Sequence, residues 1–202
     1  MKDKDVSAQL NTPLDQPDVL CIGAPIIDAI AQVPHSFLRK NKIHKGGSTI
    51  VSDDKLGKIL SRLGDEAQYL AGGCAANTAC SLATLDTKVQ FAGRIGEDQQ
   101  GKAFCDAFED FGVHYDPAMD DDRGTAVLAC LVTPDRERSF VYSMTSARWF
   151  LSLDDLPRVM PRVVYCESNI IDVSGENEGQ TFLDDLLAAR FYRGSVIIMN
   201  LN

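Results

Sequence analysis

The chain of 202 residues contains no run that approaches the roughly 20 apolar residues a membrane-spanning helix needs. Acidic side chains outnumber basic ones by 29 to 20, so the net charge is −9 and the pI is about 4.7. Proteins that bind nucleic-acid phosphates or anionic lipid carry a basic patch, and this sequence has no basic run. We therefore expect neither a membrane nor a nucleic acid as a partner.

Closely spaced metal ligands are also missing. The six cysteines lie in apolar stretches without a C-x-x-C pair, and the three histidines are far apart in the sequence. Because zinc sites need clustered thiolates or imidazoles, we expect no metal ligands in this chain. The cysteine pattern favours reduced thiols packed in the core of a cytoplasmic protein.

The first 17 residues differ in composition from the rest of the chain. Residues 1–17 are polar and mixed in charge, and they lack the apolar core of a signal peptide. Over the whole chain, 45% of the residues are apolar and 24% are charged, which is the balance of a globular protein with a core. We expect a disordered lead-in over 1–17 and one domain over 18–202.

Short apolar runs alternate with amphipathic stretches along the chain. The clearest helix is expected at 98–111, where Phe104, Phe108 and Phe111 share one face and Gly112 ends the pattern. The other expected helices are 53–63, 75–85 and 179–192, and the expected strands are 18–23, 68–71, 89–94, 162–167 and 195–202. This alternation predicts an α/β fold with a mostly parallel sheet flanked by helices.

Two segments do not fit the alternation. The strands expected at 125–132 and 138–144 flank the turn residues 133–137, which is typical of a hairpin. Within residues 26–52, Ile26 to Val33 alternates imperfectly, and the stretch through His44-Lys-Gly-Gly47 has turn chemistry. We expect both segments to form a separate small β element beside the main sheet.

Several polar residues and glycines follow the expected strands. Asp28, the pair Gly72-Gly73 and Glu167 come just after, or at the end of, a strand, and ligands of open α/β sheets bind at that edge. Glycines at a helix start let the backbone approach a ligand, and Asn77 in the same helix offers a donor and an acceptor. The set suits a polyhydroxylated small molecule such as a sugar. A tight strand-to-helix turn with surface carboxylates would show the same spacing.

Other ligand motifs fail on their residues. Gly72–Asn77 departs from the dinucleotide fingerprint G-x-G-x-x-G at its third and sixth positions. The chain has no G-x-x-x-x-G-K-[ST] phosphate loop. The acidic stretch 116–122 lacks the glycine and glutamate of a calcium loop, so we expect a solvated connection there.

Four ordered blocks resemble the ribokinase/adenosine kinase (PfkB-type) family. They are CIGAPIID at 21–28, AGGCAANTA at 71–79 with VQFAGRIGEDQQG at 89–101, the hairpin at 125–140, and VVYCES at 163–168. The similarity extends from about residue 18 to residue 202. It implies a ribokinase-like (Rossmann-like) α/β fold in which segments 26–52 and 122–146 form a small β lid.

The resemblance implies an ATP-dependent phosphotransferase that acts on the hydroxymethyl group of an adenosine-like nucleoside or a sugar, with ATP and Mg²⁺ as cofactors. By position, Asp28 and Asn77 would hold substrate hydroxyls, and Gly72 and Gly73 would let the backbone line the pocket. Glu167 would be a further substrate contact. The lid would close over the substrate, and the resemblance also makes a homodimer through the lid an expectation.

Some family elements are missing from this sequence. Asp86 and Arg136 stand where the family usually has small residues or glycine, so we expect altered turns there. The D-T-x-G-A-G-D segment that carries the family's catalytic base is absent, as is the N-x-x-E magnesium element. We therefore expect the catalytic base and the ATP site beyond residue 202, an inactive chain when taken alone, and an exposed apolar sheet edge at its end. A non-catalytic relative, serving as a sugar- or nucleoside-binding or assembly module, is the alternative.

Overall fold

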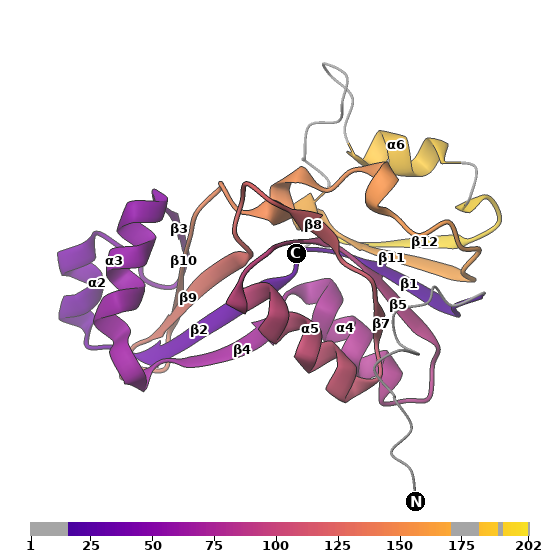
Figure 1. Ribbon diagram of the computed structural model, residues 1–202. Coiled ribbons are helices and arrows are strands. Elements are labelled where there is room, and N and C mark those ends of the chain that lie inside the picture. Colours follow the sequence, from indigo (N-terminus) through magenta and orange to yellow (C-terminus); the bar gives the residue numbers. More distant parts are fainter. Residues whose placement is uncertain (1–15, 171–181, 190–191, 202) are drawn as a thin grey trace, which may run out of the picture.

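Two five-stranded sheets build the molecule, one parallel and one mixed (Figure 1). The computed structural model describes residues 16–170, 182–189 and 192–201, so nearly all of the expected lead-in lies outside the described residues. The strands are β1 (Val19–Ile22), β2 (Ile26–Gln32), β3 (Ser48–Ile50), β4 (Gln68–Gly72), β5 (Val89–Ala92), β6 (Arg94–Gly96), β7 (His114–Tyr115), β8 (Ala118–Asp120), β9 (Ala126–Val132), β10 (Arg138–Tyr142), β11 (Val163–Glu167) and β12 (Val196–Asn200). The α-helices are α2 (His35–Asn41), α3 (Asp53–Leu63), α4 (Cys74–Ala83), α5 (Gln99–Phe111) and α6 (Phe182–Ala188). Short 3₁₀ helices cover Gly64–Glu66, Ala147–Phe150, Leu153–Asp155 and Ser168–Ile170.

The parallel sheet has the strand order β12-β11-β1-β5-β7, and each neighbouring pair runs parallel. Helix α6 lies over one face, and α4 and α5 lie on the other (Figure 1). Parallel sheets are covered on both faces, and the central strand β1 accordingly has Leu20, Cys21 and Ile22 fully buried. The predicted α/β fold with a mostly parallel, helix-flanked sheet is confirmed.

An aromatic cluster fills the space between α5 and the parallel sheet. The rings of Phe91, Phe104, Phe108 and Tyr115 lie 4.5–6.0 Å apart in tilted or edge-to-face arrangements. Such pairs add to the free energy of burying each ring. Phe104 and Phe108 of the predicted stripe point into this cluster, whereas Phe111 is half exposed.

The mixed sheet has the order β3-β10-β9-β2-β4. Strands β9 and β10 form the predicted antiparallel hairpin, and β2 runs parallel to β9. Residues of α2 and α3 pack with one face of this sheet in a cluster that includes Leu38, Ile59 and Leu131. The expected β element at 26–52 supplies β2 and β3, but it also contains α2, which the sequence reading missed. That helix has seven residues and follows Pro34 without a side-chain cap, so its local signal is weak.

Three other elements differ from expectation. The strand expected at 68–71 is β4, and it pairs antiparallel with β2 in the mixed sheet rather than joining the parallel sheet. Residues 89–94 divide into β5 and β6, and β6 pairs with β8 in a separate two-stranded sheet. Helix α4 ends at Ala83 rather than residue 85. Each difference depends on long-range pairing or on a helix end, which local periodicity does not encode.

The last part of the described chain carries the outermost strand of the parallel sheet. The helix expected at 179–192 is seen as α6, and residues 179–181 and 190–191 lie outside the described residues. Strand β12 pairs with β11, and Val196, Ile198 and Leu201 are 61%, 46% and 71% exposed. The expected exposed apolar edge is therefore present.

Candidate functional site

Glu167 ends β11 and connects three segments of the chain. Its carboxylate Oε1 accepts a hydrogen bond from the Ala24 N–H at 2.7 Å, and Oε2 accepts one from the Ala75 N–H at 2.8 Å. Ala24 lies in the link from β1 to β2, and Ala75 lies at the start of α4. The side chain is fully buried, and burial raises its pKa while these amide hydrogen bonds oppose the shift.

The glycines near this carboxylate have no room for a side chain. A Cβ atom at Gly72 would overlap Oδ2 of Asp28, and one at Gly73 would overlap the carbonyl oxygen of Ala24. Gly73 also has a φ of 110°, which glycine adopts without the strain that other residues incur. The turn from β4 to α4 is therefore packed directly against both Asp28 and the β1–β2 link.

Asp28 lies in the middle of β2 in the mixed sheet. The sequence had predicted a position just after a strand of the main sheet instead. Its register partners are Leu70 on β4 and Leu128 on β9, so the carboxylate has apolar neighbours on its face of the mixed sheet. Burial raises its pKa from 3.8 to about 6. Near neutral pH the group is ionised and can accept hydrogen bonds from a ligand, and below pH 6 it is increasingly protonated.

Asn77 lies one turn into α4, on a more exposed face than the other expected site residues. Its backbone N–H donates to the Gly73 carbonyl at 2.9 Å. The residue lines a cleft of about 570 Å³ together with Leu70 and Ala71 of β4. Leu70 is also the register partner of Asp28, so this cleft borders the Asp28 strand pair.

Arg148 is a site residue that the sequence reading missed. It is buried, its guanidinium lies 5.4 Å from the centre of the Tyr142 ring, and it interacts electrostatically with Glu167. Burial lowers its pKa and Glu167 opposes that shift. The available signal was an arginine within the otherwise apolar run from Ala147 to Leu151. Since Tyr142 belongs to the mixed sheet and Glu167 to the parallel sheet, Arg148 bridges the two.

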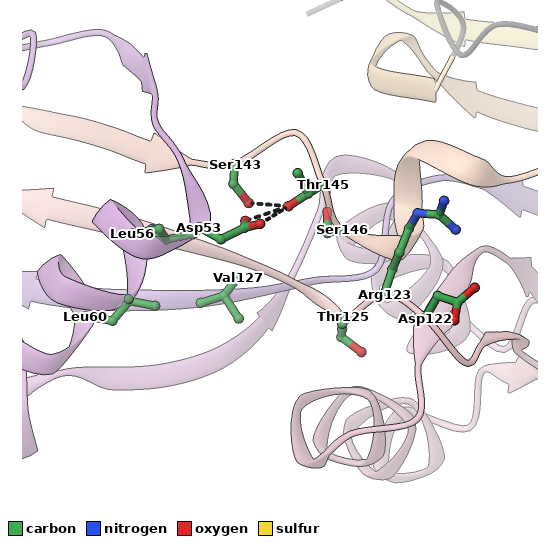
Figure 2. Close-up of a pocket in the computed structure, with 12 residues that line it drawn as sticks. Asp53, Leu56, Leu60, Asp122, Arg123, Thr125, Val127, Ser143, Thr145 and Ser146 are labelled. Carbon is green, nitrogen blue, oxygen red and sulfur yellow. Dashed lines mark hydrogen bonds between the residues drawn. The ribbon is translucent and has the colours of Figure 1, made fainter.

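A second cavity, of about 490 Å³, lies beside α3 (Figure 2). Val127 of β9 lines this cavity. Leu128, the next residue in β9, is the register partner of Asp28. Because successive side chains of a strand point to opposite faces, the cavity borders the face of the mixed sheet opposite Asp28. Figure 2 shows Thr145 donating to both carboxylate oxygens of Asp53, at 2.5 and 2.6 Å. Hydrogen bonds from Thr145 and Ser143 lower the pKa of Asp53. This cavity is thus distinct from the surroundings of Asp28.

The geometry places four of the five expected site residues around one junction. Asp28, Gly72, Gly73 and Glu167 meet at the β1–β2 link, and Asn77 is one turn away. The junction offers an acceptor, a backbone turn that admits close approach, and a rigid support beneath both. Across residues 16–170, 182–189 and 192–201, no group of three His, Cys, Asp or Glu side chains is arranged to hold a metal ion.

Fold and junction together define a ribokinase-like α/β protein. The crystal structure of adenosine kinase from Sinorhizobium meliloti is similar, with a TM-score of 0.78 and 31% identity. That similarity covers 92% of this chain and 56% of the Sinorhizobium chain. The predicted fold class is thereby confirmed at the level of the fold family.

The particular family follows from the sequence comparisons. The model of the pfkB family of carbohydrate kinases matches residues 16–159, and the chain belongs to this family. Adenosine kinase from Dictyostelium discoideum is 29% identical over 138 residues, which are 65% of this chain and 39% of the relative. Aminoimidazole riboside kinase from Salmonella typhimurium is 36% identical over 88 residues, which are 43% of this chain and 28% of the relative. The chain thus spans about two fifths or less of these curated relatives.

Proposed function

We propose that this chain forms the substrate-binding part of a kinase that transfers a phosphoryl group from ATP to the hydroxymethyl group of a nucleoside or sugar. The observation that carries the proposal is the contact between Asp28 and the Gly72-Gly73 turn. Ionised Asp28 would accept hydrogen bonds from substrate hydroxyls, with Asn77 as a second polar contact. The two glycines would let the backbone line the pocket.

A riboside is the substrate class we favour. Two of the matching relatives bear the names adenosine kinase and aminoimidazole riboside kinase, and both names describe a ribose joined to a base. The apolar neighbours of Asp28, Leu70 and Leu128, would suit the base or the sugar face beside a carboxylate that holds hydroxyls. A free sugar or a sugar phosphate is the competing substrate.

The segments 26–52 and 122–146 would act as a lid, and the mixed sheet that they help to form would close over the substrate and exclude water.

ATP and Mg²⁺ would supply the phosphoryl group and its charge compensation. Among the described residues, no group of three His, Cys, Asp or Glu side chains is arranged to hold a metal ion. A homodimer through the lid and a cytoplasmic location remain parts of the proposal. Among the described residues, no helix is long and apolar enough to cross a bilayer.

Thermal melting with saturating adenosine, ribose or fructose 6-phosphate tests the substrate class. A ligand that binds the folded state alone raises the melting temperature, and we expect the largest rise with adenosine. No shift with adenosine, together with a shift by fructose 6-phosphate, would overturn the riboside proposal.

A coupled ADP-release assay on the same 202 residues tests whether this chain binds substrate without catalysing phosphoryl transfer. We expect no turnover above background, because the sequence lacks the D-T-x-G-A-G-D segment in which the family resemblance implies the catalytic base. Turnover would contradict that expectation. Adenosine binding without turnover, even after the C-terminal part of a related kinase is added, would favour the binding-module alternative.

A further inference from the structure

Glu167 holds together segments that are far apart in the sequence. Ala24 lies 143 residues away from it and Ala75 lies 92 residues away, yet one carboxylate accepts a hydrogen bond from each. One of these amides precedes the Asp28 strand, and the other opens the helix that follows Gly72-Gly73. This side chain therefore connects the link that precedes the Asp28 strand to the start of α4, and it adds to the direct pairing of β2 with β4.

The chemistry of the contact requires a carboxylate. An ionised carboxylate presents two acceptor oxygens, so it satisfies two opposed N–H groups at once. The first N–H groups of α4 also form the positive end of the helix, where a negative charge is favourable. Arg148 lies within electrostatic reach and offsets the cost of burying that charge. A glutamine of the same size would turn an N–H₂ group toward one of the two amides.

The packing leaves no tolerance around the contact. A Cβ atom at Gly23 would lie 2.5 Å from the Cβ of Ala75 and 2.9 Å from the Glu167 carboxyl group. Glu167 is fully buried and each of its oxygens accepts a hydrogen bond from a backbone amide, so neither oxygen faces solvent. These facts separate Glu167 from Asp28, which is partly exposed and lies among leucines.

We propose that Glu167 is a positioning residue that fixes the Asp28 strand and the Gly72-Gly73 turn relative to each other without contacting the substrate. This inference rests on the proposed function for its consequence in binding. It differs from the family resemblance, which implies a direct contact between Glu167 and the substrate. The two readings predict different results for the same variant.

Amide spectroscopy of the 202-residue chain tests the positioning role without a ligand. In E167Q, at least one of the Ala24 and Ala75 amide protons should move upfield and exchange at least about tenfold faster, because a hydrogen bond to a charged group is lost. The resonances of Asp28, Gly72 and Gly73 should shift as well. If these five residues keep their wild-type shifts and exchange rates, the proposal is wrong.

A second variant guards against the loss of folding in E167Q. G23A keeps the carboxylate but pushes it away from Ala75, so it should perturb the same amides. G57A is the matched control, since a Cβ atom at Gly57 meets nothing within 4 Å and lies on α3. A G23A spectrum in which the Ala75 amide is unchanged would also count against the proposal.

Binding of deoxy analogues separates positioning from direct contact. Adenosine and its 2′-, 3′- and 5′-deoxy analogues are titrated into the wild type, E167Q and D28N by calorimetry. A positioning residue predicts a similar fold loss of affinity in E167Q for every analogue. A direct contact predicts that the loss disappears for the analogue that lacks the contacted hydroxyl, which is the result we expect for D28N.

The two sets of measurements keep the proposals apart. If the wild type binds none of these nucleosides, the riboside proposal fails, while the amide spectra still decide whether Glu167 positions the junction. If nucleosides bind and the E167Q penalty vanishes for a single analogue, Glu167 contacts the substrate and the positioning role is wrong.

Discussion

The parallel and mixed sheets give a carboxylate different surroundings. In the parallel sheet, both faces are covered and Glu167 has each oxygen bonded to a backbone amide. In the mixed sheet, α2 and α3 pack on one face, and Asp28 lies between two leucines on another strand face with a pKa raised to about 6. The first carboxylate binds backbone amides, and the second is the group that we propose binds a ligand.

The largest expected effect comes from disrupting the hydrophobic core that packs against the parallel sheet. F104A removes a fully buried ring from the aromatic cluster between α5 and the parallel sheet. We expect the free energy of unfolding to fall by about 3–5 kcal/mol, measured by urea denaturation. I59V in the helix layer of the mixed sheet should cost only about 0.5–1.5 kcal/mol. Equal losses in the two variants would contradict the contrast between the regions.

The junction between the sheets should be the next most sensitive place. In G73A, a residue with a φ of 110° gains a Cβ atom that overlaps the Ala24 carbonyl oxygen. We expect a loss of about 2–3 kcal/mol in stability from strain and displacement. G57A should instead stabilise α3 by roughly 0.5–1 kcal/mol, because it removes a helix-interior glycine. A neutral G73A would show that the turn is not held against the link.

The free-energy cost of ionising the partly buried Asp28 carboxylate should appear in the pH dependence of stability. Its folded pKa of about 6 lies above the ordinary value of 3.8, so its contribution is present below pH 4 and is lost as the pH rises to about 6. D28N should remove this loss and be more stable than wild type at pH 7, by roughly 1–3 kcal/mol at most. Its affinity for a hydroxylated ligand should nevertheless fall.

Urea denaturation of both proteins at pH 4, 5, 6 and 7 measures the difference curve. The exposed Asp65, replaced by Asn, serves as the control for removing one negative charge. A D28N difference that is constant from pH 4 to pH 7 would mean that Asp28 does not titrate in this window. The pKa of Asp28 would then not be raised above that of an exposed aspartate.

The smallest effect is expected at the tip of the β9–β10 hairpin. Arg136 stands where the family usually has glycine, and it adopts the left-handed conformation with a φ of 64°. R136G should raise the free energy of unfolding by about 0.5–1 kcal/mol by relieving that conformation. The neighbouring E137G, whose φ is not positive, should lower it. A destabilised R136G would mean that the arginine side chain holds the turn.

Local signals in the sequence predicted the local features well. Ser52 caps α3 by accepting a hydrogen bond from the Lys55 N–H, and Gly64 follows the end of the helix. Asp98 caps α5, and Gly112 ends it with a φ of 71°. Such caps depend on neighbours within one turn, so spacing alone reveals them. The assignment of β4 to the mixed sheet depends on pairing with β2, which no local pattern specifies.

The candidate site was predictable in part for the same reason. Gly72-Gly73 and Glu167 lie at strand ends as expected, whereas Asp28 lies inside β2, and the structure brings all of them to one junction. The backbone partners of Glu167 and the approach of Arg148 depend on packing between elements far apart in the chain. Their identification required coordinates. The roles of the expected site residues in substrate binding stay predictions until the titrations are done.

The position of β1 in the parallel sheet determines in which order the two sheets can assemble during synthesis on the ribosome. This strand lies between β5 and β11, and because Val19 pairs with Val163, one side of the central strand stays unpaired until residues made much later are available. The hairpin and the strands that pair with it are complete once Tyr142 has emerged. During synthesis the mixed sheet can therefore assemble first, with Asp28 in place, while its support is added only when Glu167 arrives.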